Sequence, residues 1–234
     1  MKIKGFEKLT LIDYPDKFAC IVFLFGCNFR CGFCHNPELV VKEENINFTE
    51  NEILDFLKKR IGKLDGVCIT GGEPLLGVDE NFLIEIKKLG FLIKIDTNGS
   101  LPDKLKSLID KKLVDFIAMD IKGEREEYKN IVDVNVDLSK IENSIKLIVG
   151  SGLDYEFRTT IIEDIHSKEN LIFMSKWINE IAGEKPKKIF LQGFRNSGKF
   201  INEKFNFKKN TSNEYLEEMK NYVQDYFEEV GIRI

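Results

Sequence analysis

The stretch FACIVFLFGCNFRCGFC, residues 18–34, joins an apolar run to a loop with three cysteines. The run at 18–26 is short and rich in Phe, Ile and Val, as buried parallel strands are. Cys27, Cys31 and Cys34 follow it with the spacing C-x3-C-x2-C. A structural zinc normally takes four ligands. Three closely spaced cysteines therefore predict a metal site with one position left open.

Short apolar runs alternate with amphipathic stretches along the whole chain. Strands are expected at 18–26, 66–70, 91–96, 114–120, 155–162 and 187–192. Helices with a 3.6-residue period are expected at 49–62, 79–90, 101–112, 137–152, 167–183 and 212–231. Thr49 followed by Glu52 predicts a capping box, and Gly90 predicts a helix end.

Six strand–helix units in chain order predict an α/β fold with a parallel sheet. A complete eight-unit barrel takes about 250 residues. The 234 residues therefore favour a partial (β/α)6 TIM-like barrel in a single domain, 1–234. A doubly wound open sheet remains an alternative, because periodicity does not give strand order. In both folds the functional residues should lie at the C-terminal ends of the strands.

The composition argues against a nucleic-acid-binding, membrane-spanning or disulfide-stabilised protein. The net charge of −4 gives no basic footprint for nucleic acid. No run approaches the roughly 20 apolar residues of a membrane span, and residues 1–10 carry no secretory pattern. Five cysteines in such a chain favour a cytoplasmic protein with metal or redox use over a disulfide framework. Cys20 and Cys68 lie inside predicted strands and are expected in the core.

Polar and glycine residues gather where the predicted strands end, which favours one active site at that rim. They are Cys27, Gly71, Gly72, Glu73, Asp96, Thr97, Asn98, Asp120, Lys122, Arg158 and Gln192. Several interpretations remain open for them. Gly71 and Gly72 could form a plain turn, and Asp96 with Asp120 could form an acid–base pair. Lys122 and Arg158 could bind an anion or neutralise the aspartates.

Three other features have simpler interpretations. His35 could complete a structural zinc site, but it is adjacent to Cys34, and consecutive side chains rarely converge on one ion. A ferredoxin-like carrier is disfavoured by the missing fourth cysteine. The segment 193–200 reads G-x4-G-K but has Phe200 where a P-loop needs Ser or Thr, so it is expected to be a polar loop. His166 is expected at a helix entry rather than in a metal site.

The cysteine motif after the first strand and GGEP (71–74) after the second resemble the radical S-adenosylmethionine superfamily, over roughly residues 10–230. The resemblance implies the partial barrel of that superfamily. It also implies that Cys27, Cys31 and Cys34 bind one [4Fe–4S] cluster, whose open iron is chelated by S-adenosylmethionine. One electron then cleaves this cofactor to methionine and a 5′-deoxyadenosyl radical.

Further motifs resemble the activases of glycyl-radical enzymes. They are CHN (34–36), the longer run 9–40, DTNG (96–99), DIK (120–122), RTTII (158–162) and LQGFRN (191–196). The run 9–40 is similar to a subgroup named anaerobic ribonucleoside-triphosphate reductase activating proteins. Glu38 and Leu39 stand where pyruvate formate-lyase activases commonly have Thr-Trp, which favours the reductase subgroup.

The resemblance to that subgroup implies that the enzyme abstracts hydrogen from a glycine of an anaerobic ribonucleotide reductase. It also implies a flavodoxin- or ferredoxin-type electron donor, and no nucleic-acid or membrane partner. One alternative is a radical enzyme acting on a small molecule, similar to a deazaguanine synthase. Another is a non-enzymatic module with structural zinc.

The resemblance also assigns residues to the cofactor. The implied S-adenosylmethionine contacts are Phe33, His35, Gly71, Gly72, Glu73, Asp96, Thr97, Asp120, Lys122 and Arg158. Asp96, Thr97 and Asp120 are the implied ligands of a monovalent cation. Phe33 could instead be a simple loop anchor, and Glu73 could bond the local backbone. No catalytic side chain is implied beyond the cluster and its cofactor.

Overall fold

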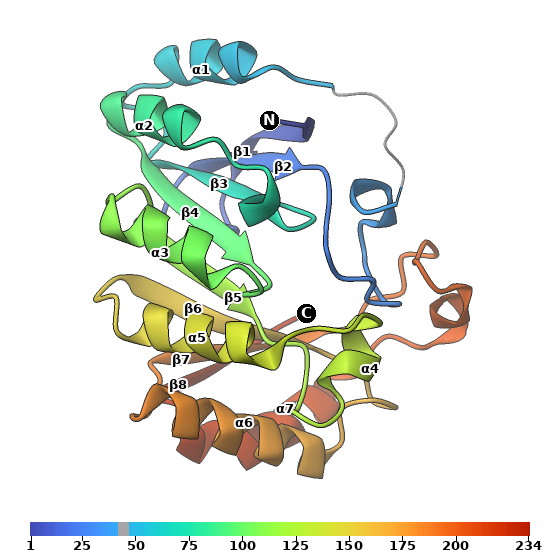
Figure 1. Cartoon of the computed structure of the whole chain (residues 1–234). Helices are drawn as coiled ribbons and strands as arrows, with labels where there is room; N and C mark the ends of the chain where they lie inside the picture. The colour runs from blue at the N-terminus through green and yellow to red at the C-terminus, as the bar shows by residue number, and fades with distance from the viewer. Residues whose placement is uncertain (42–46) are drawn as a thin grey trace. The chain divides into compact units, whose positions relative to one another are not determined.

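The computed structural model describes residues 1–41 and 47–234 (Figure 1), and these divide into two compact units. Unit 1 comprises Met1–Asn28, Asn36–Thr97 and Asp103–Ile117. Unit 2 comprises Phe29–His35, Asn98–Pro102 and Ala118–Ile234. The expectation of a single domain stays a prediction.

Unit 1 is built around four neighbouring strands and the first residues of a fifth. The strands are β1 (Ile3–Thr10), β2 (Ala19–Leu24), β3 (Gly66–Gly71), β4 (Leu92–Thr97) and β5 (Phe116–Asp120). β1 pairs antiparallel with β2, whereas β2–β3 and β3–β4 are parallel. The β2–β3 register is unbroken from Ala19 opposite Gly66 to Leu24 opposite Gly71. The C-terminal ends of these two strands therefore lie side by side.

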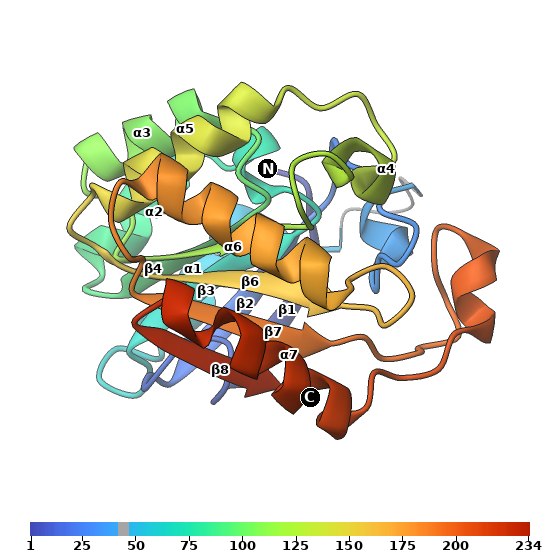
Figure 2. The ribbon, with the colours of Figure 1, turned by 90° about the horizontal axis from the view of Figure 1, so that it is seen from below.

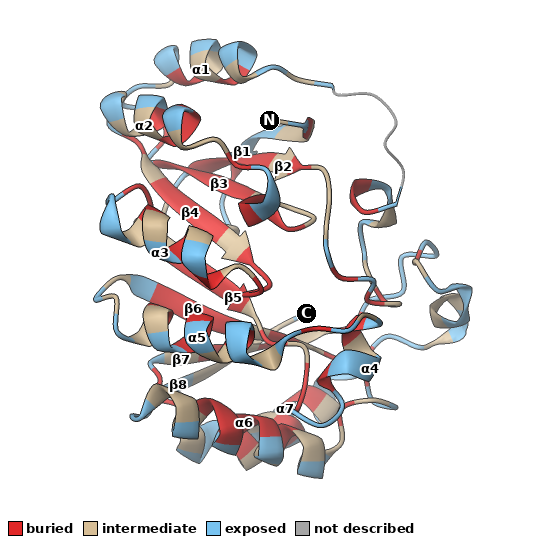
Figure 3. Ribbon diagram, in the orientation of Figure 1, coloured by how far each residue is buried: buried red, intermediate tan, exposed pale blue. Residues whose placement is uncertain are grey.

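Capping residues and a glycine mark the ends of helices in unit 1. They are α1 (Glu50–Lys58), α2 (Glu80–Lys88) and α3 (Pro102–Asp110), of which only Pro102 is counted with unit 2. Thr49 and Glu52 form the predicted capping box at the start of α1. Gly90 follows α2 with φ +88°, a conformation that glycine adopts without strain. Figure 3 shows buried residues along β2 and β3, which form the core of this unit.

Unit 2 contains the end of β5 and three parallel strands in the order β6-β7-β8. The strands are β6 (Asp154–Ile161), β7 (Lys188–Gly193) and β8 (Glu229–Arg233). The helices are α4 (Tyr128–Val132), α5 (Leu138–Val149), α6 (Lys168–Ala182) and α7 (Asn213–Val223). Helix α6 packs against both α5 and α7, and Figure 2 shows the three side by side. Ser167 and Asn170 close a capping box at the start of α6.

All six predicted strands are present, and the α/β class is confirmed. Strand β1 was not predicted, because its sequence mixes charged and apolar residues without a clear period. The predicted helix 212–231 is wrong at its end. It stops at Val223, and Glu229–Arg233 forms β8 beside β7. No helix among the described residues has the length and apolar character of a membrane span.

Candidate functional site

The end of β3 approaches the β2 end closely in unit 1. The Gly72 N–H donates to the Leu24 carbonyl at 3.0 Å, and the Glu73 N–H donates to the Gly26 carbonyl at 2.7 Å. A Cβ at Gly72 would stand 2.1 Å from the Gly26 oxygen, and Gly71 has φ +124°. Both positions therefore require glycine, so that this backbone can pass the segment that leads into Cys27. Their contact with the methionine part of a cofactor stays a prediction.

Glu73 is a buried carboxylate, with 1% of its surface exposed. Its Oε1 accepts from the Leu75 N–H at 3.1 Å and from the Thr97 hydroxyl at 2.8 Å. The first bond caps the 3-10 helix η2 (Pro74–Leu76), and the second reaches the end of β4. Of the two roles expected for Glu73, the bond to the local backbone is present, and Thr97 is held by the same oxygen.

Lys94 was not singled out from the sequence, although it is 1% exposed in β4. Its ammonium donates to the carboxylate of Asp96. The two residues are two apart in a strand and therefore point to the same face. A lysine within the apolar run FLIKID was the available signal. Asp96, predicted as a cofactor or cation ligand, thus carries an internal counter-charge.

The segment Phe29–His35, called the cysteine loop below, packs in unit 2 on the 3-10 helix η3 (Glu203–Phe207). The Gly32 carbonyl accepts from the Asn202 N–H at 3.1 Å, and a Cβ at Gly32 would lie 2.7 Å from the Phe205 ring. The ring centroids of Phe33 and Phe205 are 5.9 Å apart. Phe33 thus anchors the loop, as the simpler interpretation expected, and its predicted contact with a cofactor remains untested.

His35 lies among aromatic rings of the segment that follows β7. Its ring centroid is 5.9 Å from that of Phe194 and 5.7 Å from that of Phe200. Partial burial first, and the Lys122 ammonium second, lower the pKa of His35. Phe194 and Phe200 are buried, whereas 195–199 between them is exposed. The segment that resembles a P-loop is therefore an exposed loop with two buried aromatic ends.

Asp120 stands at the end of β5 in a group of three charges. It accepts from Arg158 Nε at 2.8 Å and from Lys122 Nζ at 3.0 Å. Burial alone would raise the pKa of Asp120, but Arg158 and Lys122 hold it well below its usual value. The interpretation of Lys122 and Arg158 as partners that neutralise an aspartate is thus correct for Asp120.

His166 fixes the backbone beside this charged group. Its Nε2 lies 2.9 Å from the Lys122 carbonyl, and its Nδ1 accepts from the Ile162 N–H at 3.1 Å. Burial lowers the pKa of His166, so the neutral ring with a proton on Nε2 satisfies both contacts. His166 directly precedes Ser167, the N-cap of α6. The expectation of a helix-entry residue is confirmed.

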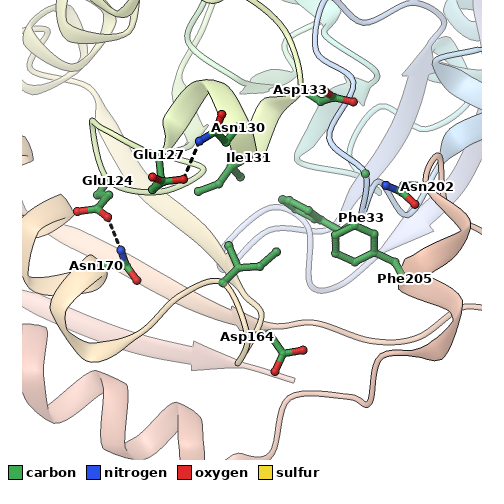
Figure 4. A pocket seen from close by; sticks show the side chains of 12 residues that line it. Phe33, Glu124, Glu127, Asn130, Ile131, Asp133, Asp164, Asn170, Asn202 and Phe205 are labelled. Carbon is green, nitrogen blue, oxygen red and sulfur yellow. Dashed lines mark hydrogen bonds between the residues drawn. The ribbon is translucent and has the colours of Figure 1, made fainter.

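A pocket of about 620 Å³ opens beside Phe33 within unit 2. Figure 4 shows Phe33 and Phe205 on one side of it and Glu124, Glu127 and Asn130 on the other. Glu124 accepts from Asn170, and Glu127 accepts from Asn130 at 2.8 Å. Further lining residues are Gly32, Ile131, Asp133, Asp164, Ile165, Asn170 and Asn202. The lining holds four carboxylates and neither Lys nor Arg, which favours a cationic or hydrogen-donating group.

The cysteines separate into two kinds. Cys20 and Cys68 are buried in unit 1, and burial raises the pKa of Cys20 to about 12 and that of Cys68 further. Of the three motif cysteines, Cys27 and Cys34 are partly exposed and Cys31 is buried. Cys27 belongs to unit 1, whereas Cys31 and Cys34 belong to unit 2. No three His, Cys, Asp or Glu side chains in the described part of the chain form a ready metal group. The cysteine triad stays a prediction.

Residues 21–171, more than half of the chain, match the family model of the radical SAM superfamily. One relative, from Methanocaldococcus jannaschii, is provisionally named glycyl-radical enzyme activating enzyme MJ1227. It is 34% identical over 189 residues, which cover 76% of this chain and 75% of the relative. The pyruvate formate-lyase-activating enzyme of Clostridium pasteurianum is 30% identical, covering 77% of each chain. A 7-carboxy-7-deazaguanine synthase of Methanospirillum hungatei is 34% identical over 69% of this chain and 64% of its own.

Solved structures share the fold at lower identity. Streptococcus suis SuiB bound to S-adenosylmethionine matches with TM-score 0.68 and 18% identity. The match covers 91% of this chain and 51% of SuiB, so the chain spans about half of that protein. TYW1 matches with TM-score 0.62 and 15% identity, over 89% of this chain and 74% of its own. These matches confirm the predicted α/β fold of the radical SAM type. The chain therefore belongs to the radical SAM superfamily of enzymes and is a homologue of glycyl-radical enzyme activating enzymes.

Proposed function

We propose that this enzyme activates a glycyl-radical enzyme by abstracting hydrogen from one glycine of its partner. The carrying observation is homology along about three quarters of both chains to two proteins named as activating enzymes. The motif CHN at Cys34–Asn36 and the spacing of the three cysteines agree with this assignment. Within it, an anaerobic ribonucleotide reductase is the partner, and a flavodoxin- or ferredoxin-type protein is the electron donor. The location is cytoplasmic.

The radical SAM family implies one [4Fe–4S] cluster and S-adenosylmethionine. The chemistry of the donors agrees with this cluster, because three cysteines stand within eight residues of the sequence and thiolates are the usual ligands of iron–sulfur clusters. Cys27, Cys31 and Cys34 would hold it, leaving one iron for the cofactor. When bound, the cluster and S-adenosylmethionine supply the electron and the radical that abstracts hydrogen.

The other predicted residues position the cofactor in this proposal. Phe33 and His35 would face its adenosine part, and Gly71, Gly72 and Glu73 its methionine part. Thr97, Lys122 and Arg158 complete the polar surroundings. Asp96 already accepts a hydrogen bond from Lys94. Asp120 accepts hydrogen bonds from Arg158 and Lys122. Because these side chains supply positive charge, the proposal includes no monovalent cation.

The pocket beside Phe33 suits a segment of a protein partner. Its amides and carboxylates offer hydrogen-bond acceptors, and its aromatic wall, Phe33 and Phe205, adjoins the cysteine loop. A peptide carries many backbone N–H donors, which such a wall of acceptors can satisfy. We place the partner's glycine-bearing segment here.

A second candidate is a radical enzyme that acts on a small molecule. The similarity to a 7-carboxy-7-deazaguanine synthase favours it, although the match covers less of each chain than those of the activating enzymes. The two candidates differ in one observable: an activase leaves a stable radical on a protein, whereas the alternative releases a modified metabolite.

The test is anaerobic reconstitution with iron and sulfide, followed by reduction with S-adenosylmethionine and a candidate ribonucleotide reductase. We expect 5′-deoxyadenosine and a glycyl-radical signal in electron paramagnetic resonance. The signal should vanish when the partner's glycine is replaced by alanine. Cofactor cleavage without a signal on any partner, together with turnover of a deazaguanine precursor, would favour the second candidate.

A matched pair of cysteine variants tests the cluster assignment. Cys31→Ala should lose both the brown cluster absorbance and cofactor cleavage. Cys68→Ala removes a buried thiol outside the motif and should keep both. Cleavage that survives in Cys31→Ala would reject the assignment, and one zinc without iron or sulfide in anaerobically purified protein would reject the enzyme itself.

A further inference from the structure

Residues 195–210, called the basic loop below, lie between β7 and α7 and carry a charge opposite to that of the chain as a whole. Five cations stand there against the single acid Glu203: Arg195, Lys199, Lys204, Lys208 and Lys209. The net charge of the loop is therefore +4, whereas the whole chain carries −4. Figure 2 shows this segment, in orange, projecting beyond the end of β7. Such a local concentration of charge attracts a partner of opposite sign.

Most of these cations are not used by the fold. Lys208 pairs with Asp164 at 2.5 Å, and its ammonium lies 5.7 Å from the ring centroid of Phe205. The other four are exposed and make no ion pair within the part of the chain that the structure describes: Arg195, Lys199, Lys204 and Lys209. Four positive charges of the basic loop are therefore available to a partner.

An exposed aromatic side chain lies among these cations. Phe207 exposes 89% of its surface. It borders a hollow of about 450 Å³ that is lined by Lys204, Phe207, Lys208 and Lys209 of the loop and by Ile162, Glu163 and Asp164 after β6. The two carboxylates in this lining already accept from Ser212 and Lys208. Aromatic side chains are enriched at protein interfaces, so Phe207 among cations has the character of a docking surface.

The basic loop is held in shape by contacts within unit 2. The side-chain amide of Asn196 donates to the carbonyls of Asn206 and Lys208, each at 2.8 Å. At the base of the loop, the ring centroids of the buried Phe194 and Phe200 are 5.2 Å apart. A surface that is ordered before binding loses less conformational entropy when a partner docks.

The basic loop also contacts the cysteine loop. The Gly32 carbonyl accepts from the Asn202 N–H at 3.1 Å, and the ring centroid of Phe33 lies 5.9 Å from that of Phe205. Both contacted residues stand between the second and third motif cysteines. A protein bound to the basic loop is therefore placed beside two prospective cluster ligands. Electron transfer needs such an approach, because its rate falls steeply with distance.

We propose that the basic loop is the docking surface of the electron donor, an acidic electron-carrier protein. This inference rests on the proposed function, in which a reduced carrier gives one electron to the enzyme and is itself oxidised. Electron-transfer complexes have small interfaces, in which complementary charge serves the rate of encounter more than affinity. Four cations around one exposed ring fit such an encounter. The pocket beside Phe33 holds four carboxylates, which would repel the same carrier.

Charge reversal on the loop, matched by charge reversal elsewhere in unit 2, tests the inference. The loop variant is Lys204→Glu with Lys209→Glu, and the control is Lys176→Glu with Lys185→Glu, which changes two exposed lysines outside the loop. The probes are an acidic flavodoxin and an acidic ferredoxin, whose binding to the cluster-free proteins is measured by calorimetry at low ionic strength. The affinity of the carrier that binds the parent more tightly should fall roughly tenfold in the loop variant and less than about twofold in the control. Added salt should weaken its binding to the parent.

Electron transfer to the reconstituted enzyme gives a second readout. In stopped-flow measurements, the second-order rate constant with the reduced carrier should fall roughly tenfold in the loop variant. Photoreduction by 5-deazaflavin, a small molecule that needs no docking surface, should be equal in all three proteins.

Three results would overturn the inference. They are a loop variant that matches the control in affinity and rate, a parent that binds neither carrier, and a loop variant that keeps carrier binding but loses binding of the ribonucleotide reductase. The last result would assign the loop to the protein substrate. A parent that accepts electrons from the carrier but raises no glycyl radical would instead overturn the proposed function, so the two failures are distinguishable.

Discussion

The polar residues at the strand ends of unit 1 and those of unit 2 differ in how far folding satisfies them. In unit 1, Glu73 accepts from the Leu75 N–H and the Thr97 hydroxyl, and Lys94 donates to Asp96. In unit 2, the group around Asp120 is also paired, yet the neighbouring Tyr128 hydroxyl has no partner.

This difference separates two tasks. The polar residues of unit 1 bond to one another and hold their strand ends in position, so their removal should cost stability whether or not a cofactor is bound. A buried hydroxyl without a hydrogen-bond partner costs stability, so removal of the Tyr128 hydroxyl should not destabilise the cluster-free protein. Each prediction below tests whether a group belongs to the first kind.

The largest effect is expected from Lys94→Met. The change leaves Asp96 without its buried ammonium, and removal of one partner of a buried ion pair typically costs about 3–5 kcal/mol. Urea unfolding of the cluster-free protein measures the loss. Lys88→Met breaks the exposed pair with Glu85 and should cost about 0.5 kcal/mol or less. Equal losses in the two variants would show that burial of the Lys94 pair is unimportant.

Gly72→Ala should come next. The new Cβ would meet the Gly26 oxygen at 2.1 Å, and this neighbour is backbone that cannot turn aside. We expect a loss of about 3 kcal/mol, at the upper end for overpacking, together with weaker cluster assembly through the shifted Cys27 segment. Gly77→Ala provides the control, because no atom lies within 4 Å of a Cβ there and its φ is −135°. An equally stable Gly72→Ala would contradict the close-approach argument.

The sequence predicted the parallel strands better than it predicted their flanks. Runs such as that of β2 are apolar on both faces, and burial on both faces is what makes a parallel strand recognisable. Strands β1 and β8 have mixed or half-buried patterns. The residues of β8 continued the periodicity of α7 closely enough to be mistaken for helix.

The candidate site shows the same division. The spacing of the cysteines predicted Cys27, Cys31 and Cys34 as candidate metal ligands. The positions of the predicted strand ends indicated Glu73 and Asp120 as candidate site residues. Local sequence could not give the pairing of side chains that lie far apart in the chain. The bond between Glu73 and Thr97 spans 24 residues. The ring contact between Tyr128 and Trp177 likewise joins residues that are distant in the sequence.

Two substitutions at Glu73 separate its structural role from a cofactor role. Both of its bonds described here end on Oε1, and glutamine keeps one such carbonyl oxygen. Glu73→Ala should cost about 2 kcal/mol, because it removes the acceptor of the Leu75 N–H and of the Thr97 hydroxyl. Glu73→Gln should cost less than half of that in thermal unfolding of the cluster-free protein. If Glu73→Gln keeps its stability but weakens S-adenosylmethionine binding to the reconstituted enzyme, the negative charge serves the cofactor.

The smallest effect is a pH dependence from Asp120. Arg158 and Lys122 depress its pKa in the folded state, whereas the unfolded value is near 3.9. Its contribution to stability is therefore complete above about pH 4 and is lost as the pH falls towards the folded pKa. The parent should be more stable than Asp120→Asn at pH 6, and the two melting temperatures should converge between about pH 4 and pH 2. Asp110→Asn, on the exposed face of α3, should instead melt in parallel with the parent over that range. A gap between the parent and Asp120→Asn that stays constant with pH would mean that the pairing with Arg158 and Lys122 does not stabilise the charged form. The three charges would then be held together by the fold, rather than contributing to its stability as we expect of the Lys94–Asp96 pair of unit 1.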